Sequence, residues 1–78
     1  MEINNMVLGL RVMCKHNTLY ELQGNRGLTP MQINEAKTVY NNANGNCKLY
    51  AYTKFFNNAV QKMDYVWIEI DIADLDKI

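Results

Sequence analysis

The feature that most constrains this chain is an eight-residue run near its C-terminus, which alternates strictly between two kinds of side chain. One set is branched and apolar: Val66, Ile68, Ile70 and Ile72. The other set is aromatic or acidic: Tyr65, Trp67, Glu69 and Asp71. Because successive side chains of a strand point to opposite faces of a sheet, residues 65–72 predict a half-buried strand. The fold is therefore expected to contain a sheet that packs against the core on one face and is exposed to solvent on the other.

Two segments near the N-terminus predict a β-hairpin. Residues 6–14 alternate as a strand does, and residues 18–23 form a shorter strand after a polar break at residues 15–17. A short polar break between two such runs is typical of a hairpin connection.

A helix is predicted after the hairpin because its start and its end both carry signals. Thr29 is a good N-cap, Pro30 fits the first helical position, and Gln32 completes a capping box. Gly45 can take the left-handed conformation that ends a helix, so the helix is expected from Pro30 to about Asn44. Apolar residues follow helical spacing at Ile33, Ala36, Val39, Tyr40 and Ala43.

Residues 47–63 fit two patterns. Apolar side chains with helical spacing run through the segment, yet residues 47–53 also alternate like a strand rich in aromatics. The sequence of residues 39–43 is echoed at residues 55–59, which favours a shared conformation. We therefore expect a helix over residues 54–63 that extends back to residue 47, with a strand at residues 47–53 as the alternative.

These elements predict a single compact α+β domain over residues 1–78. It has an antiparallel sheet of three or four strands with two helices packed on one face, in the order β-β-α-α-β. A strand at residues 47–53 would change the order to β-β-α-β-α-β. Residues 73–78 are expected to be a short acidic tail. A chain of 78 residues buries a modest fraction of its surface, which favours a partner or a dimer.

The charges of the chain sum to zero but are unevenly distributed. Eight basic and eight acidic residues, with 49% hydrophobic residues, exclude a highly charged disordered tail. Residues 1–63 carry seven bases and three acids, whereas residues 64–78 carry five acids and one base. The chain is thus a basic body with an acidic end, and such an asymmetry can mark an interaction surface.

Neither an enzyme nor a cofactor protein is indicated. Cys14, His16 and Cys47 lack the paired spacing of zinc ligands, so no metal site is expected. Glu69 and Asp71 share a wet strand face, which favours solvation over acid–base catalysis. Two cysteines are too few for a disulfide scaffold, and the first apolar run stops at Arg11, too short to span a membrane. A cytoplasmic chain with reduced cysteines is expected.

The outer face of the last strand is the first candidate binding surface. Tyr65 and Trp67 are residue types common at interface anchors, and neighbouring acids would steer a basic partner. The predicted binding residues are Tyr65, Trp67, Glu69, Asp71, Asp74 and Asp76. The alternative is that these aromatic rings are covered, either by a second layer or by Arg11 and Tyr20 from neighbouring strands.

The expected function is a small non-enzymatic protein-binding module of the phage or mobile-element type. By its size and composition it resembles anti-CRISPR and other anti-defence inhibitors, with a basic or nucleic-acid-binding host protein as the target. A homodimer is a further possibility. The alternative is a small nucleic-acid binder in which cations are interleaved with aromatic rings. Its binding residues would be Arg26, Lys37, Lys48, Lys54 and Lys62.

Overall fold

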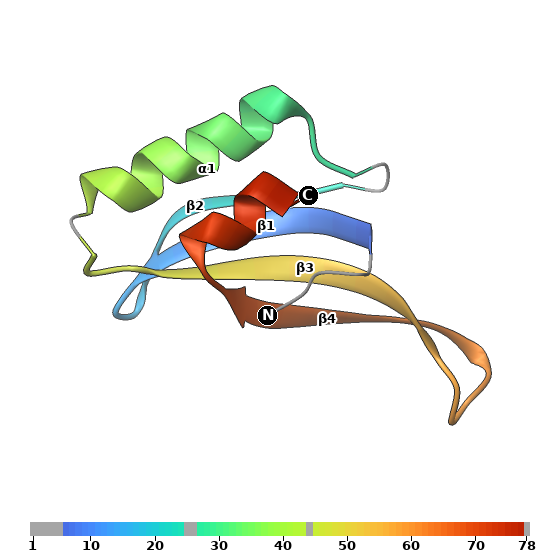
Figure 1. The fold of residues 1–78 in the computed structure, drawn as a ribbon. Coiled ribbons are helices and arrows are strands. Elements are labelled where there is room, and N and C mark those ends of the chain that lie inside the picture. The colour runs from blue at the N-terminus through green and yellow to red at the C-terminus, as the bar shows by residue number, and fades with distance from the viewer. Residues whose placement is uncertain (1–5, 25–26, 44, 78) are drawn as a thin grey trace.

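The computed structural model describes residues 6–24, 27–43 and 45–77, which form a four-stranded antiparallel sheet with helices (Figure 1). The strands lie in the order β2-β1-β3-β4. The elements in chain order are β1 (Met6–Cys14), β2 (Asn17–Gln23), α1 (Pro30–Asn42), β3 (Lys48–Asn57), β4 (Lys62–Ile70) and the 3₁₀ helix η1 (Ile72–Lys77). The α+β class is confirmed.

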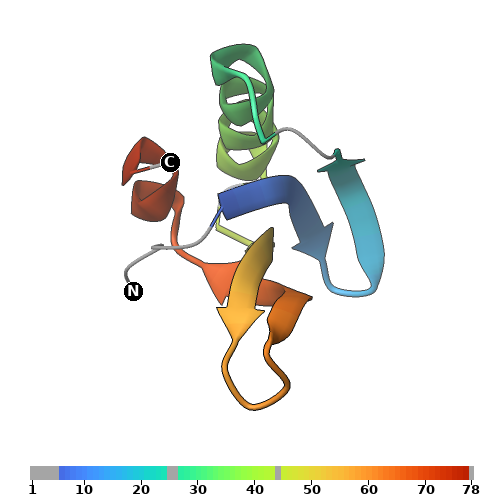
Figure 2. The same ribbon diagram turned by 90° about the vertical axis from the view of Figure 1, so that its right-hand side faces the viewer.

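Both helices lie on the same side of the sheet, so the core is a single layer between them and the strands (Figures 1 and 2). Helix α1 packs against β1 and β2, and η1 lies beside it. The core is built from small and branched apolar side chains of every layer: Val7, Leu10, Val12, Ala36, Cys47, Leu49, Ala51, Ile70 and Leu75. The opposite face of the sheet carries no described helix or strand.

The hairpin and the capped start of the helix are confirmed. The helix ends at Asn42, and Asn44, its predicted end, lies outside the described residues. Cys14 pairs with Asn17 across a two-residue turn, where Lys15 adopts a positive φ of 56°. At the start of α1, the Thr29 hydroxyl accepts from the Gln32 N–H at 3.2 Å, and the Gln32 side chain accepts from the Thr29 N–H at 2.9 Å. This reciprocal box satisfies two of the amide donors that a helix start leaves free.

The helix expected over residues 54–63, and back to residue 47, is wrong. Residues 48–57 form β3, in which Leu49, Ala51 and Thr53 are buried and the intervening residues lie on the other face. Ladders to β1 on one side and β4 on the other stabilise the extended form. The sequence echo fails because Asn57 begins a turn, where its side-chain oxygen accepts from the Ala59 N–H at 3.0 Å.

The predicted element order is corrected accordingly. The chain has one α-helix of the expected two and a sheet of four strands, in the order β-β-α-β-β followed by η1. The segment expected as an acidic tail folds as η1. Leu75 is only 2% exposed and packs into the core, so apolar burial holds this segment against the sheet.

Gly9 is required where β1 bulges toward β3. Leu8 is an extra residue between the Val7–Thr53 and Gly9–Tyr52 pairs. A Cβ at Gly9 would lie 2.5 Å from the Leu22 carbonyl oxygen and 3.3 Å from the Tyr52 Cβ. The neighbouring strands therefore approach β1 more closely than any side chain at this position would allow.

We predict that Gly9→Ala lowers the free energy of unfolding by about 2 kcal/mol or more, because the backbone oxygen of Leu22 cannot move aside cheaply. Gly24→Ala is the matched control, since a Cβ there meets nothing within 4 Å. Urea unfolding followed by circular dichroism measures both variants. Equal stability of the two variants would show that the bulge tolerates a side chain.

Candidate functional site

The sheet face that points away from the helices carries a row of aromatic side chains. The register pairs Tyr50 with Glu69, Tyr52 with Trp67, and Lys54 with Tyr65 across β3 and β4. Arg11 of β1 pairs with Tyr50 on the other side of β3. We call Arg11, Tyr50, Tyr52, Tyr65 and Trp67 the aromatic face.

Three rings of the aromatic face form one connected cluster with Tyr52 at its centre. The Tyr52 and Trp67 ring centroids are 5.0 Å apart at 41°, and the Tyr52 and Tyr65 centroids are 5.8 Å apart at 15°. Aromatic pairs at such separations are worth about 0.5–1.5 kcal/mol beyond their burial. The cluster is thus held in place before any partner arrives.

Arg11 lies over the indole of Trp67, with its guanidinium carbon 4.1 Å from the ring centroid. The same guanidinium forms an ion pair with Glu21 of β2. The alternative that Arg11 and Tyr20 cover the aromatic rings is therefore correct for Arg11 and wrong for Tyr20. Arg11 does contact Trp67, whereas Tyr20 lies on the helix-facing side and hydrogen-bonds to α1.

The aromatic face carries charges of both signs. Lys48 and Glu69 approach to 3.9 Å, and Arg11 is paired with Glu21. Lys54 lies beside Tyr65 in the ladder. Exposed ion pairs of this kind contribute little stability, but they leave the face without one dominant sign of charge.

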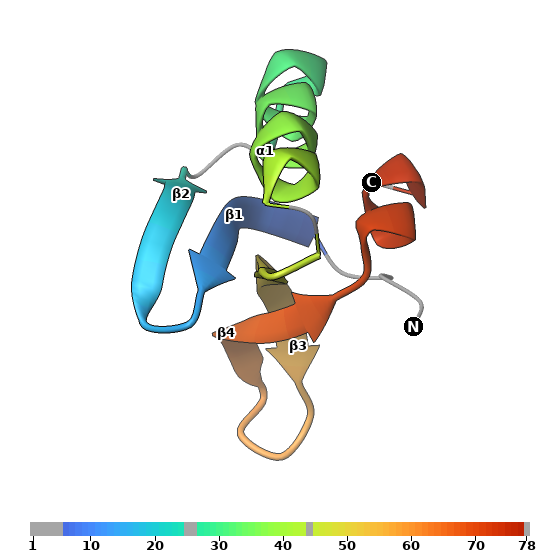
Figure 3. The same cartoon turned by 90° about the vertical axis from the view of Figure 1, so that its left-hand side faces the viewer.

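Exposed apolar side chains continue the aromatic face toward the end of the β3–β4 hairpin. Phe56 and Met63 are opposite one another, next to the Lys54–Tyr65 pair. Phe56 is 51% exposed, Met63 is 44% exposed and Tyr65 is 47% exposed. The hairpin bends away from the helix layer, which leaves this end uncovered (Figures 1 and 3).

The structure divides the predicted binding residues between two sides of the molecule. Tyr65, Trp67 and Glu69 lie together on the aromatic face. Asp74 is buried, and its carboxylate accepts from the Asp71 N–H at 3.0 Å, which closes the start of η1. Asp76 forms an ion pair with Lys37 of α1, on the helix side. Asp74 and Asp76 therefore do not extend the aromatic face.

The alternative set of basic residues is not gathered on one surface either. Lys48 and Lys54 flank the aromatic face, and Lys62 lies at the start of β4. Lys37 is on α1, paired with Asp76. Arg26 lies outside the described residues.

Sequence reasoning misplaced two of the five residues of the aromatic face. Tyr50 and Tyr52 were expected on a helix, with a strand as the alternative, and Met63 was not singled out. The signal that could have found the two tyrosines was the alternation over residues 47–53, because a strand there places both rings on one face.

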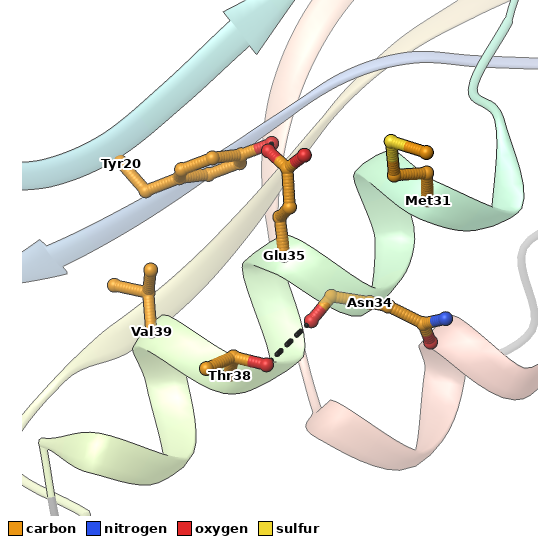
Figure 4. Close-up of a pocket in the computed structure, with 6 residues that line it drawn as sticks. All are labelled: Tyr20, Met31, Asn34, Glu35, Thr38 and Val39. Atoms are coloured by element: carbon orange, nitrogen blue, oxygen red, sulfur yellow. Dashed lines mark hydrogen bonds between the residues drawn. The ribbon is translucent and has the colours of Figure 1, made fainter.

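A second surface feature is an open groove of about 660 Å³ between β2 and α1 (Figure 4). Its lining residues are Tyr20, Met31, Asn34, Glu35, Thr38 and Val39. The Tyr20 hydroxyl donates to the Glu35 carboxylate at 3.1 Å, and the Thr38 hydroxyl donates to the Asn34 carbonyl at 2.9 Å. These bonds occupy polar groups that a ligand would otherwise use.

No metal-binding cluster and no membrane-spanning helix is found in the part of the chain that the structure describes. Over residues 6–24, 27–43 and 45–77, no three His, Cys, Asp or Glu side chains are grouped so that they could hold a metal ion. Within the same ranges, neither helix has the length and apolar character needed to cross a membrane.

Burial raises the pKa of the Tyr20 phenol, and the hydrogen bond and charge of Glu35 raise it further. The folded protein therefore holds this proton at a pH where the unfolded chain, with the ordinary value of 10.0, has released it. Below pH 10.0 both the folded and the unfolded state keep this proton. As pH rises from there through the raised pKa of the folded state, the free energy of unfolding falls.

We predict that the free energy of unfolding falls as pH rises above about 10, and that it falls less steeply in Tyr20→Phe. At neutral pH the substitution costs about 0.5–1 kcal/mol for the lost hydrogen bond. Urea unfolding at a series of pH values measures both effects. Glu35→Gln should also flatten the slope. Identical slopes in all three proteins would contradict the assignment of this proton.

Comparison with known proteins adds no further identification. No family model, no curated protein and no solved structure matches the chain. Because one fold can host many functions, the function has to be argued from a site. Among the surfaces of the described residues, we take the aromatic face as the candidate binding site.

Proposed function

We propose that the chain is a small, non-enzymatic protein-binding module and that the aromatic face is its docking surface. The observation that carries this proposal is the connected cluster of Tyr52, Tyr65 and Trp67 on the uncovered side of the sheet. Trp, Tyr and Arg are the residue types that most often dominate binding energy at protein interfaces. All three are present within one patch, as Arg11 lies over Trp67.

Pre-ordering supports a docking role. Each ring is restrained by a neighbour, so the cluster loses little side-chain freedom when a partner covers it. The rings sit on paired strands rather than on a loop, which fixes their spacing. Phe56 and Met63 lengthen the apolar strip and give a partner more area to bury.

The mixed charges favour a partner with an apolar patch and a polar rim. Glu69 and Glu21 are the acids beside the rings, and each already has a basic neighbour. A strongly basic groove on the partner, as the acidic end of the chain suggested, is therefore not required. That the partner belongs to a host defence system stays a prediction from size and composition.

A protein partner is favoured over single-stranded nucleic acid by two features. Base stacking needs ring faces that are free, whereas Tyr52 stacks on Tyr65 and Arg11 covers Trp67. Phosphate binding needs clustered cations, whereas Arg11 and Lys48 are paired with acids.

We predict that Trp67→Ala and Tyr65→Ala each weaken partner binding by about 30-fold or more, because a buried aromatic anchor contributes about 2 kcal/mol. Met31→Ala is the matched control: Met31 is 72% exposed but lies on α1, on the other side of the sheet. Affinity capture from the native host's lysate with mass spectrometry identifies the partner, and titration calorimetry measures each variant. Circular dichroism checks that each variant is folded.

Three outcomes would contradict the proposal. Folded Trp67→Ala could capture the same protein with unchanged affinity, or Met31→Ala could lose it instead. Salt-sensitive retention on single-stranded DNA that is lost in Trp67→Ala would favour the nucleic-acid alternative. A dimer that persists over a dilution series in light scattering, and dissociates in Trp67→Ala, would identify a second copy as the occupant.

A further inference from the structure

One cysteine of the chain, Cys14, ends β1, and the other, Cys47, immediately precedes the neighbouring strand β3. The ladder between β1 and β3 pairs Val12 with Leu49 and then Met13 with Lys48. If the same antiparallel register is continued by one step, Cys14 falls opposite Cys47, the residue just before β3. Directly opposite residues have Cα atoms about 4.5–5.5 Å apart, and a disulfide needs about 4.4–6.8 Å.

Both thiols are on the helix-facing side of the sheet. Cys47 is 7% exposed and belongs to the core, and the half-buried Cys14 packs against that core. Burial raises the pKa of the Cys47 thiol, and the hydrogen bond and charge of Cys14 add to the effect. Both thiols thus belong to one packed layer, and both are free.

We propose that Cys14 and Cys47 are a pair of thiols that can be oxidised to an intramolecular disulfide. The oxidant is a low-molecular-weight disulfide such as oxidised glutathione. The site goes beyond the proposed function, because the aromatic face lies on the other side of the sheet and takes no part in the reaction.

The reaction takes place in two exchange steps that balance. The Cys14 thiolate, the more accessible of the two, attacks one sulfur of glutathione disulfide and releases one glutathione thiolate. Cys47 then loses its proton and attacks the Cys14 sulfur, which releases the second glutathione. The protein gives up two protons and two electrons, and the small disulfide is reduced to two thiols. Because the thiolate is the nucleophile, the closing step accelerates as pH rises.

The new bond would tie the end of β1 to the residue that precedes β3. The loop that it closes contains β2 and α1, so the unfolded chain would lose freedom over most of the N-terminal half. The bond lies at the opposite end of β3 from the β3–β4 turn, where Phe56 and Met63 are exposed. Oxidation is therefore expected to change stability and leave the hairpin end as it is.

The test treats the reduced, full-length chain with oxidised glutathione, blocks free thiols with N-ethylmaleimide and measures the intact mass. The wild type should become a monomer that has lost two hydrogens and takes up no blocking group. Its melting temperature should rise by about 8 °C or more, and dithiothreitol should reverse the change. Cys47→Ser should stop at one glutathione adduct, and Cys14→Ser should react at least about tenfold more slowly.

The mass spectra keep the test independent of how the serine variants fold. A wild type that stops at a glutathione adduct would overturn the proposal, since the second thiol would then be out of reach. Disulfide-linked dimers as the main product would overturn it as well. A disulfide that forms without any rise in melting temperature would also contradict the proposal, because it would show that the two residues are not placed for an unstrained bond.

Discussion

The pairing of β1 with β3 is the constraint on which the rest of this small fold depends. These strands are the two central ones, and they supply Leu10, Val12, Leu49 and Ala51, all at most 1% exposed. Helix α1 contributes only Ala36 as a fully buried residue, so it has little to pack on without them. Joining residues so far apart in sequence has a loop-closure cost, which the burial of these side chains must offset.

The same strands link stability to the candidate site, because β3 serves both faces of the sheet. Leu49, Ala51 and Thr53 point into the core, whereas Tyr50 and Tyr52 lie on the aromatic face. A register slip of one residue would exchange the two sets. Binding and folding therefore depend on one hydrogen-bond ladder. Gly9, opposite Tyr52, allows the strands to approach at the point where the ring cluster sits.

Local signals predicted about half of this architecture. The hairpin and the box at Thr29 and Gln32 depend on residues close in sequence, and both are confirmed. The alternating segment predicted over residues 65–72 does form a strand, but that strand ends at Ile70, Ile72 belongs to η1 and Val66 is exposed. Residues 47–63 were misassigned because helical and strand spacing both fit them. The strand is selected by its ladders on both sides: β1 lies far away in the chain, and β4 follows β3 directly after a turn. Two rings of the aromatic face, Tyr50 and Tyr52, were misplaced with that strand.

The acidic end shows why charge counted along a sequence does not locate a binding surface. Leu75 anchors η1 in the core, and this burial decides where the neighbouring carboxylates go. Asp74 is a buried hydrogen-bond acceptor for the Asp71 N–H, and Asp76 forms an ion pair with Lys37. Exposed pairs such as Lys37–Asp76 add little free energy, so they follow the apolar packing rather than direct it. With Asp74 and Asp76 on the helix side, and with Glu69 and Glu21 beside basic residues, recognition on the aromatic face depends on ring shape and spacing more than on net charge.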